Sequence, residues 1–393
     1  MKSSILFSIS LALLFKLSYS LSIVTRCNDK FVADGKTFYF TGSNNYYLHY
    51  FEEDVASKVF DIAKKHKFNV LRTWGFLDEA YNVSGIYYTS FNNATREIVV
   101  NEGEKGLQRL DKIVALAEQH GIRLIITLTN NWADFGGMEQ WVRDFGFTEH
   151  YQFYTEPEIK KSFKKYIKTI LNRTNSITGK KYKEDGTIFS WELANEPRCW
   201  GTNMGKNEKC TTETVTSWID EMSTYIKSID PKHMVSSGEE GFGLAGVDTD
   251  NDIYQFGDGN DFVKNASLKN IDFATIHLYA TYWGFKDFIK EGIQYFESHA
   301  KAMKEQVKKP IIMEEFGLPV DLRDEVYPAY MQSLIDNDYN GIMFWMLAHD
   351  EYPNYDGFNL YDKDVTTYVD DFTAIQKAKG SKKVICKKCK AKF

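Results

Sequence analysis

The stretch TIFSWELANEP, residues 187–197, decides the fold. Its first half is apolar, aromatic or β-branched, as in a short buried strand, and the pattern stops at Pro197 because proline cannot donate to a strand ladder. Glu196 therefore lies at the carboxyl end of a predicted strand. A carboxylate is costly to bury without a partner, so Glu196 is a solvated charge, half of an ion pair or a working group.

Seven other short runs of β-branched and aromatic residues surround this strand, and stretches with apolar residues at helical spacing lie between most of them. The predicted strands are 38–45, 68–74, 121–128, 187–196, 233–238, 271–279, 310–316 and 341–347. The predicted helices are 54–67, 107–120, 159–172, 215–229, 285–307 and 325–337. No helix is evident in 241–270, which is rich in Gly, Asp and Asn.

Strands that alternate with helices form a parallel sheet with right-handed crossovers. Eight such units, with no linker rich in Pro or Ser between them, predict the α/β class and a single (β/α)8 TIM barrel with long βα loops. In that fold the strand ends that open into the βα loops converge on one face. Reactive groups far apart in the sequence should meet there.

The composition narrows the class of function. The formal net charge of −6 excludes a generally basic nucleic-acid binder. An aromatic fraction of 15%, with 8 Trp and 24 Tyr among 393 residues, favours a surface that stacks flat ligands. His277 and scattered carboxylates lack the spacing of metal ligands, so we expect no metal and no organic cofactor.

The amino-terminal segment is typical of a secretory signal. Lys2 precedes an apolar run over 5–15, and Ser18 and Ser20 fit a signal-peptidase site, which predicts a signal peptide over 1–20. A membrane anchor is the alternative, but the run is shorter than the ~20 residues that span a bilayer. We therefore expect a secreted, extracellular monomer without a membrane partner. Its catalytic domain would cover 21–379, and a basic tail, solvated or anchoring, would cover 380–393.

Secretion makes disulfides and glycans plausible. Cys199 and Cys210 flank a loop that directly follows Asn-Glu-Pro, so a bridge between them is predicted. The pairing of Cys27, Cys386 and Cys389 stays open, and the CxxC of the last two lacks a second pair for zinc. Three N-x-S/T sequons predict glycosylation, and they begin at Asn82, Asn172 and Asn265.

Polar and aromatic side chains stand at most of the predicted strand ends. They are Arg72, Trp74, Trp132, Asn195, Glu196, His277, Tyr279, Glu315 and Trp345. Each has an ordinary structural interpretation; Arg72, for example, could be an ion pair and Trp345 could fill the core. Such a collection at the strand ends of one barrel is hard to attribute to chance.

Glu196 and Glu315 end the fourth and seventh predicted strands and could face each other across the barrel mouth. Hydrolysis of a glycosidic bond needs such a pair, one carboxylic acid to protonate the leaving oxygen and one carboxylate to attack the sugar or activate water. The acid needs a raised pKa and the nucleophile a low one. Arg72, His277 and Tyr279 could hold Glu315 ionised.

The motifs LRTWGF, NNWADFGG, WELANEPRC, TIHLY, MEEFG and FWML occur in this order on the predicted strands. Together they resemble the retaining (β/α)8 enzymes of glycoside hydrolase family 5, and more narrowly the secreted endo-β-1,4-mannanases. The resemblance spans about 31–374. It implies that Glu196 is the acid/base and Glu315 the nucleophile, with Arg72, Asn195, His277, Tyr279 and Trp345 around them. Trp132, Arg198 and Trp283 match cleft positions more loosely.

Two choices depend on this resemblance. Adjacent residues on a strand face opposite ways, so only one of Glu314 and Glu315 should point into the mouth, and the family pattern favours Glu315. The implied activity is retaining endo-hydrolysis of β-1,4-mannosidic linkages in mannan, glucomannan or galactomannan. The alternatives are a β-1,4-glucanase of the same family and a glycan-binding protein without turnover. The preferred backbone and the number of subsites are not evident from the sequence.

Overall fold

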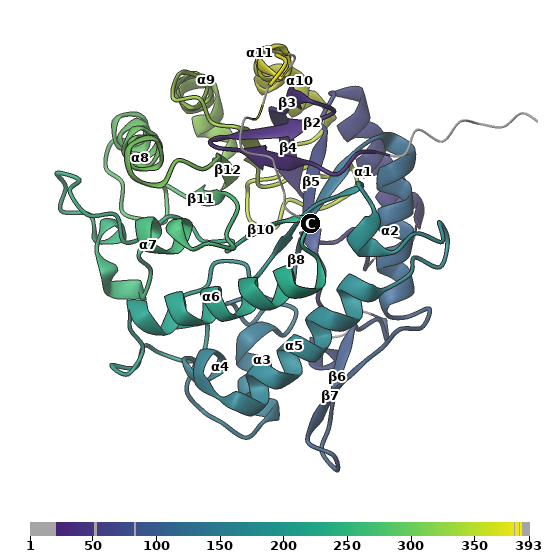
Figure 1. Ribbon diagram of the computed structural model, residues 1–393. Helices are drawn as coiled ribbons and strands as arrows, with labels where there is room; N and C mark the ends of the chain where they lie inside the picture. Colours follow the sequence, from purple (N-terminus) through teal and green to yellow (C-terminus); the bar gives the residue numbers. More distant parts are fainter. Residues whose placement is uncertain (1–20, 51–52, 82–83, 381, 385, 387–393) are drawn as a thin grey trace, which may run out of the picture.

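The computed structural model describes residues 21–393 except 51–52, 82–83, 381, 385 and 387–393. Within them a parallel sheet of eight strands runs in the order β10-β9-β8-β5-β4-β13-β12-β11 (Figure 1). The edge strands β10 and β11 approach each other, because Asp272 N donates to Val235 O over 2.8 Å and His277 N to Glu240 O over 3.0 Å. The sheet is thus a nearly closed barrel, which confirms the predicted (β/α)8 fold.

The strands match the eight predicted runs but are shorter at their ends. They are β4 (Phe40–Asn44), β5 (Val70–Trp74), β8 (Arg123–Thr127), β9 (Ile188–Glu192), β10 (Met234–Ser236), β11 (Ala274–Leu278), β12 (Ile311–Phe316) and β13 (Gly341–Phe344). All their residues are buried. Burial on both faces explains why they read as continuous apolar runs instead of alternating ones.

Helices surround the barrel (Figure 1). Those expected from the sequence are α1 (Glu53–Lys65), α2 (Leu107–His120), α5 (Pro157–Asn172), α6 (Thr212–Ile229), α8 (Phe288–Ala302) and α9 (Val320–Asp336). Shorter helices are α3 (Gly137–Asp144), α4 (Gln152–Thr155), α7 (Phe262–Ser267), α10 (Asp362–Tyr368) and α11 (Asp370–Lys379). The six-residue α7 occupies the place where the sequence gave no helical pattern.

Helix α2 illustrates why these residues form these elements. Leu107, Leu110, Val114 and Ala117 lie on one face and are buried against the barrel. The helix ends at Gly121, whose φ of 70° is the left-handed conformation that glycine adopts without strain. Both ends of this helix match the prediction, because the spacing of the apolar residues and the glycine that follows the last turn indicate the same bounds.

An amino-terminal meander closes one end of the barrel. It consists of the antiparallel strands β1 (Thr25–Cys27), β2 (Lys30–Ala33) and β3 (Lys36–Thr37). Phe31 packs against Phe40, Phe189 and Phe273, with ring centroids 6.1, 5.1 and 5.3 Å apart. Phe40 begins β4, so the meander covers the amino ends of the strands and leaves the carboxyl ends open for a site.

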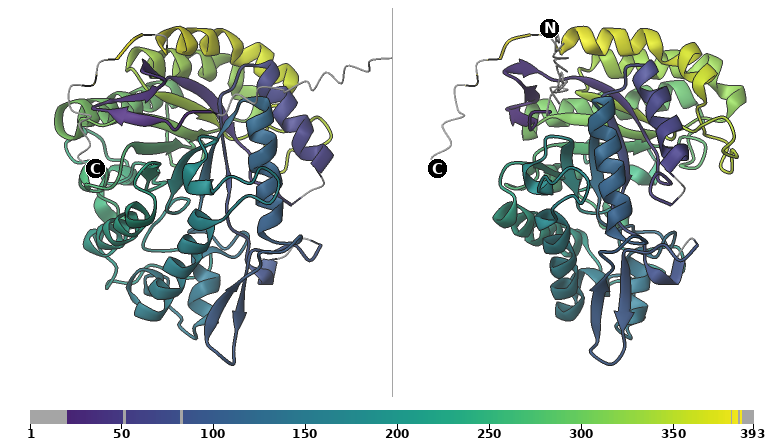
Figure 2. Two further views of the ribbon diagram at one scale, coloured as in Figure 1. Left: turned by 45° about the vertical axis from the view of Figure 1, so that its right-hand side comes forward. Right: turned by 90° about the vertical axis from the view of Figure 1, so that its right-hand side faces the viewer.

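The sequence analysis missed this meander and a second hairpin, β6 (Thr89–Asn92) with β7 (Glu97–Val100). The second hairpin extends away from the barrel, as both views of Figure 2 show. Strands of two to four residues carry too little pattern to be recognised without their partners.

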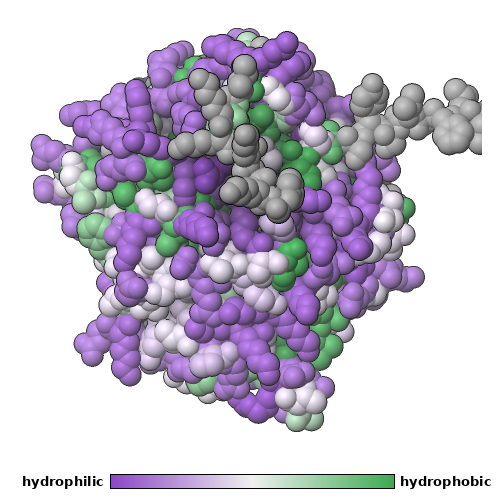
Figure 3. All heavy atoms as spheres, viewed as in Figure 1, coloured by the Kyte–Doolittle hydropathy of each residue, from purple (hydrophilic) through white to green (hydrophobic). Residues whose placement is uncertain are grey.

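The start of the predicted tail is attached to the barrel. Cys386 is disulfide-bonded to Cys27, Thr37 N donates to Lys382 O over 2.9 Å, and Val384 N donates to Gly35 O over 3.0 Å. This differs from a solvated tail for Lys382, Val384 and Cys386. Cys389, Asn82 and the predicted signal peptide 1–20 lie outside the described residues. Figure 3 shows a mostly hydrophilic face, and no helix of the described chain has the length and apolarity to cross a bilayer.

Candidate active site

A β-bulge in β12 places two adjacent glutamates inside the barrel. Ile276 of β11 is level with Met313, but the next residue, His277, is level with Glu315, so Glu314 is the extra residue. Both Glu314 and Glu315 consequently contact Arg72. Strict alternation does not hold across a bulge, so the two side chains share the barrel interior at different depths. Glu315 lines the open cleft, whereas Glu314 is fully buried beneath it.

Arg72 on β5 joins buried polar groups of three other strands, β4, β9 and β12, and of the segment that follows β9. Its guanidinium donates to Glu315, to Glu192 Oε1 over 2.8 Å, and to the amide oxygens of Asn44 over 3.0 Å and Asn195 over 2.8 Å. The side chain is fully buried. A rigid guanidinium with this many partners fixes Glu315 and Asn195 in orientation.

Glu196 follows β9 in a left-handed conformation, with φ of 52°. Strand β9 itself ends at Glu192, four residues earlier than the sequence predicted. The Glu196 carboxylate accepts a hydrogen bond from Trp132 Nε1 over 2.6 Å and pairs with His277 Nδ1 at 2.7 Å. His277 thus contacts Glu196 more closely than Glu315, from which Nδ1 is 3.6 Å away. His277 also acts on Glu315, because its positive charge opposes the rise in the pKa of that carboxyl group.

The directions of the two pKa shifts differ from the expectation. Burial raises the pKa of Glu196, but the hydrogen bond and positive charge of His277, with Arg198 and Trp132, lower it to about 2. Burial raises the pKa of Glu315, and His277, Arg72 and the Tyr279 hydroxyl oppose this rise. The proton of the Glu196 and His277 pair therefore lies on His277.

Glu315 accepts a second hydrogen bond, from the Tyr279 hydroxyl over 2.7 Å. One carboxylate oxygen of Glu196, one of Glu315 and one nitrogen of His277 lie within 4.8 Å of one another. Among the described residues this is the one group of acidic and His side chains close enough for a metal ion. Both ring nitrogens of His277 already face carboxylates, so it offers no free lone pair, and we assign no metal to the group.

Two hollows meet at Glu196. The first, of about 440 Å³, contains Glu315 and the rings of Tyr46, Trp74 and Trp345. The second, of about 660 Å³, contains Arg198 and Trp283 but not Glu315. Trp132, Glu196, Tyr279 and Tyr282 line both hollows. A groove therefore continues past the two glutamates in both directions.

Aromatic rings form the walls of the first hollow. Trp345 stacks on Tyr46 with centroids 5.8 Å apart and an interplanar angle of 20°, and its Nε1 donates to Asp356 over 2.8 Å. The ring centroids of Trp74 and Trp345 are 6.0 Å apart, and Arg72 Cζ lies 4.9 Å from the centroid of the Trp74 ring. These contacts hold the ring faces in place for a flat ligand such as a sugar.

Arg198 holds the walls of the second hollow together. It pairs with the buried Glu240 and lies 5.1 Å from the rings of both Trp132 and Trp200. Trp283 contacts Phe242 at 4.8 Å and Tyr279 at 6.1 Å, edge to face. Arg198 and Trp283 thus lie in the cleft, as predicted from looser matches.

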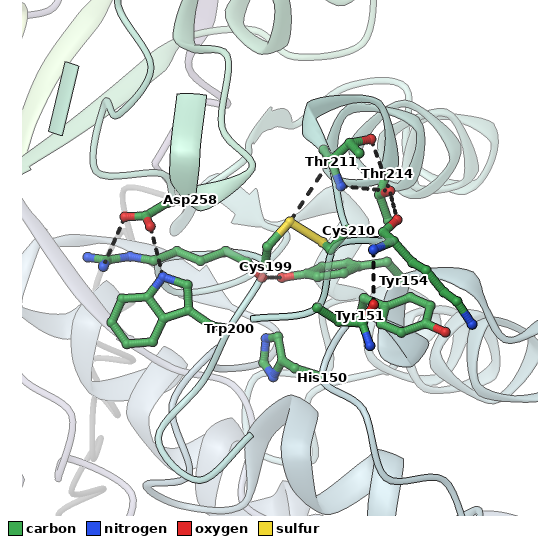
Figure 4. The surroundings of a disulfide bond; sticks show 12 residues. His150, Tyr151, Tyr154, Cys199, Trp200, Cys210, Thr211, Thr214 and Asp258 are labelled. Atoms are coloured by element: carbon green, nitrogen blue, oxygen red, sulfur yellow. Dashed lines mark hydrogen bonds and ion pairs between the residues drawn. A yellow bond between two sulfur atoms is a disulfide. The ribbon is translucent and has the colours of Figure 1, made fainter. Parts of the chain in front are cut away.

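The loop after Arg198 carries the predicted disulfide, Cys199 with Cys210. Figure 4 shows the bridge between Trp200 and the start of α6, where Thr211 and Thr214 form a capping box. Cys199 N donates to Asp258 O over 2.8 Å, and Trp200 Nε1 donates to Asp258 Oδ1 over 2.9 Å. The bridge therefore fixes the loop that positions Trp200 and Arg198.

The candidate residues from the sequence line this cleft or, in the case of Arg72 and His277, lie buried beneath it. The sequence analysis missed Glu192, which is also buried beneath the cleft. The missed wall residues are Tyr46, Phe135, Trp200, Tyr282, Tyr355 and Phe358. Trp200, next to Cys199, could have been found from its place in the quoted motif region. The others lie on loops whose course the sequence does not reveal.

The sequons have different environments. Asn265 is fully buried, donates to Glu239 over 2.6 Å and accepts from Thr216 over 2.5 Å, so no glycan fits there and that expectation is corrected. Asn172 is exposed at the end of α5. Asn93, an overlooked sequon, is exposed at the tip of the hairpin β6–β7. Glycosylation of Asn82, Asn172 and Asn93 stays a prediction.

A (β/α)8 barrel with paired glutamates and aromatic walls at its open end is the architecture of a glycoside hydrolase. A family model described as GH family 5 β-mannosidase-like matches residues 21–362. The chain belongs to this family.

Relatives of known name agree with this assignment. The chain is 39% identical over 330 residues to a probable mannan endo-1,4-β-mannosidase A of Aspergillus flavus, covering 82% of this chain and 79% of the relative. It is 38% identical over 341 residues to mannan endo-1,4-β-mannosidase A of Podospora anserina, covering 84% and 85%. The structure of the endo-1,4-β-mannanase from Rhizomucor miehei superimposes with a TM-score of 0.86 at 38% identity, covering 91% of this chain and all of the other.

Proposed function

We propose that this protein is an endo-β-1,4-mannanase that hydrolyses the backbone of mannan, glucomannan or galactomannan with retention of configuration. The observation that carries the proposal is the closeness of Glu196 and Glu315, whose oxygen atoms approach within 4.8 Å. Retaining pairs have carboxyl groups about 5 to 5.5 Å apart, and inverting pairs about 6.5 to 9.5 Å. An approach this close favours the retaining route.

In this mechanism Glu315 attacks the anomeric carbon while a proton passes from Glu196 to the leaving oxygen. Arg72 and Tyr279 hold Glu315 in line by hydrogen bonds to its two oxygens. As Glu315 forms its bond to the sugar, it loses its negative charge. That charge raises the pKa of His277, so its loss favours transfer of the shared proton from His277 to Glu196. Glu196 then takes a proton from water, and the hydroxide releases the sugar from Glu315.

Endo action fits the course of the groove, because a chain cut in its interior must extend on both sides of the reacting bond. The first hollow, beside Glu315, would hold the sugars that become bound to it. The second hollow, on the side of Glu196, would hold the leaving chain against Trp132, Arg198 and Trp283. The named relatives favour mannan over cellulose as the backbone.

The test is digestion of linear mannan and galactomannan, with carboxymethylcellulose as the competing substrate. We expect short manno-oligosaccharides, and a β-configured product at early times in a proton NMR spectrum. Preferential cleavage of the cellulose derivative would favour the glucanase alternative, and an α-configured first product would exclude the retaining route.

Two variants test the assigned roles. Glu196→Gln and Glu315→Gln should each lower kcat on mannan by more than about a thousandfold, since each removes a group that takes part in bond breaking. Both should fold, because glutamine preserves shape and most hydrogen bonds. Activity within tenfold of wild type in either variant would refute the role of that residue. Binding of mannan by the wild type without new reducing ends would support the binding-protein alternative.

We further propose that the chain is secreted as a monomer after removal of residues 1–20. Two disulfide bonds support an oxidising destination. Mass spectrometry of the protein from a secreting host should give an amino terminus near Leu21, and light scattering should give the mass of one chain. An intact terminus at Met1 would contradict the proposed processing.

A further inference from the structure

The buried group of charged residues beneath the cleft contains two carboxyl groups, Glu314 and Glu192, that the mechanism above does not use. Glu314 lies at its centre and is fully buried. The groups that face it are Arg72 from β5, Glu192 from β9, His277 from β11 and its own neighbour Glu315. Glu196 lies one step further, across the His277 ring. Four carboxylates thus share two cationic side chains, so at least one carboxylate must be protonated to avoid buried negative charge.

The hydrogen bonds locate that proton. Oε1 of Glu314 receives no hydrogen bond from any N–H or O–H group of the described residues. Glu314 and Glu192 both face Arg72 Nε, Glu192 Oε1 at 2.8 Å and Glu314 Oε2 at 3.6 Å. Glu192 accepts hydrogen bonds from Arg72, Thr127 and Ser236, whereas the nearest donor to Glu314 is His277 at 3.2 Å. The carboxylate with the fewer donors is the harder one to keep charged, so Glu314 carries the proton.

The other oxygen of Glu314, Oε2, faces His277 Nε2 at 3.2 Å. This oxygen accepts the Nε2 proton, so the Nδ1 side of the ring exchanges a proton with Glu196. His277 is therefore placed between two carboxyl groups with different tasks. Glu314 fixes one side of the ring, and Glu196 performs the chemistry on the other.

We propose that Glu314 is a positioning residue whose protonated, neutral form allows His277 to pass its proton to Glu196, so that Glu196 can act as the general acid. The inference rests on the proposed function and adds to it the way in which Glu196 receives the proton that it donates. In the transfer, the N–H bond at Nδ1 of the imidazolium breaks and an O–H bond forms on Glu196. The imidazolium becomes neutral imidazole and the carboxylate becomes a carboxylic acid, with no other reactant.

Loss of the Glu314 proton stops this transfer. An anionic Glu314 at Nε2 stabilises the imidazolium, so the proton stays on His277 and Glu196 remains ionised. Burial and the charge of Glu192 raise the pKa of Glu314 to about 8, which agrees with a proton held at neutral pH and lost in mild alkali. The alkaline limb of kcat/KM then reports the ionisation of Glu314.

The principal test is the pH profile of Glu314→Gln on mannan. Glutamine keeps an oxygen for His277 Nε2 and an N–H for Glu192, but it cannot ionise. We expect less than a tenfold loss near neutral pH and an alkaline limb that moves upward by at least one pH unit. A uniform loss of activity with an unmoved limb would mean a merely structural role and would overturn the proposal.

Glu192→Gln gives the opposite prediction and carries the test even if Glu314→Gln does not fold. Without the Glu192 charge the pKa of Glu314 falls, so the alkaline limb should move to lower pH. Glu240→Gln is the matched control, because the pKa of Glu240 is also raised, to about 8, by burial, but its side chain bonds Arg198 and not His277. Glu240→Gln can change the rate, but the alkaline limb of kcat/KM should stay at the pH of the wild type. A shift of this limb in Glu240→Gln would overturn the proposal.

A substrate with a good leaving group separates this inference from the proposed function. Cleavage of a 2,4-dinitrophenyl β-mannobioside does not need general-acid help in the first step, so its kcat/KM should lose the alkaline limb in wild type and be unaffected by Glu314→Gln. A limb that persists on this substrate would overturn the inference and leave the function intact. Failure of the wild type to cleave mannan would instead overturn the function.

Discussion

Arg72, His277 and Tyr279 each contact one of the two glutamates, but their effects differ because of where they donate. Arg72 and Tyr279 donate to opposite oxygens of Glu315 and fix its orientation. His277 pairs with Glu196 on one nitrogen and with Glu314 on the other. The charge of each carboxylate is thus set by neighbours on different strands, which a sequence pattern alone does not reveal.

Removal of the Tyr279 hydroxyl should change the acid limb of the pH profile. Its hydrogen bond favours the ionised form of Glu315 and lowers the pKa of that residue. In Tyr279→Phe this pKa rises, and because the nucleophile must be ionised, the acid limb of kcat/KM on mannan should move to higher pH by about one unit. We also expect kcat to fall about 10- to 100-fold, since a hydrogen bond to a charged group contributes about 1.5 to 3 kcal/mol.

Tyr282→Phe is the control for this prediction, because Tyr282 is on the same loop and 69% exposed. Its acid limb should stay where it is in wild type. An unshifted limb in Tyr279→Phe would show that this hydroxyl does not tune Glu315.

The candidate residues were identifiable because polar types at the ends of buried strands are rare and costly. The residues alone did not distinguish Glu314 from Glu315, since their placement depends on a bulge that only the register of β11 and β12 reveals. Likewise, His277 Nδ1 lies 2.7 Å from Glu196 and 3.6 Å from Glu315, a difference in side-chain placement that no sequence pattern reveals.

At the scale of elements, the segment between β9 and Glu196 depends on a close approach of two backbones. Gly238, just after β10, has φ of 77°, and its carbonyl accepts the Glu196 N–H over 2.8 Å. A Cβ on Gly238 would lie 1.9 Å from Ala194 O and 2.9 Å from the carboxyl carbon of Glu192. Only glycine permits this approach, and it holds Glu196 in its left-handed conformation.

Gly238→Ala should therefore lower both stability and kcat. The left-handed conformation costs a residue with a Cβ about 1 to 2 kcal/mol, and displacement of residues 193–196 adds to this cost. Gly146→Ala is matched to it, because Gly146 has the same φ of 77° but nothing within 4 Å of the added Cβ. Thermal unfolding should show a Tm lower in Gly238→Ala than in Gly146→Ala by several degrees, and mannan assays should show loss of kcat in Gly238→Ala alone. Equal effects would show that strain of the backbone, and not the close approach, governs this site.

The long elements followed from the sequence because period, length and end signals agreed, as in α2. Strands of two to four residues did not, because the partner strand and not the local sequence stabilises them. The segment 241–270, which shows no helical pattern in the sequence, contains only the short α7, because 241–261 forms loops whose residues contact the cleft loop. Asn260 Nδ2, for example, donates to Pro197 O over 2.9 Å.

At the scale of the whole molecule, two disulfides act over different lengths of chain. Cys199 and Cys210 are 11 residues apart and fix one cleft loop, whereas Cys27 and Cys386 are 359 residues apart and join the meander to the carboxyl-terminal segment. The first was predicted from its place in the sequence. The second was not, because the meander that brings its ends together was itself unpredicted.

The long disulfide should stabilise the fold without affecting catalysis. A cross-link over this length removes the entropy of a very large loop from the unfolded chain, up to about 6 kcal/mol in the chain-entropy model. The double variant Cys27→Ser/Cys386→Ser should lower Tm by about 5 °C or more, because a kcal/mol corresponds to about 1 to 2 °C in a chain of this size. Its kcat/KM on mannan should stay within twofold of wild type, since the meander closes the barrel end opposite the cleft.

Cys199→Ser/Cys210→Ser should show the reverse balance. We expect a smaller fall in Tm and a clear loss of kcat/KM, because Trp200 and Arg198 lose their fixed loop. Loss of activity in Cys27→Ser/Cys386→Ser at temperatures where it remains folded would contradict this prediction. It would mean that the meander at the closed end of the barrel influences the cleft at the open end.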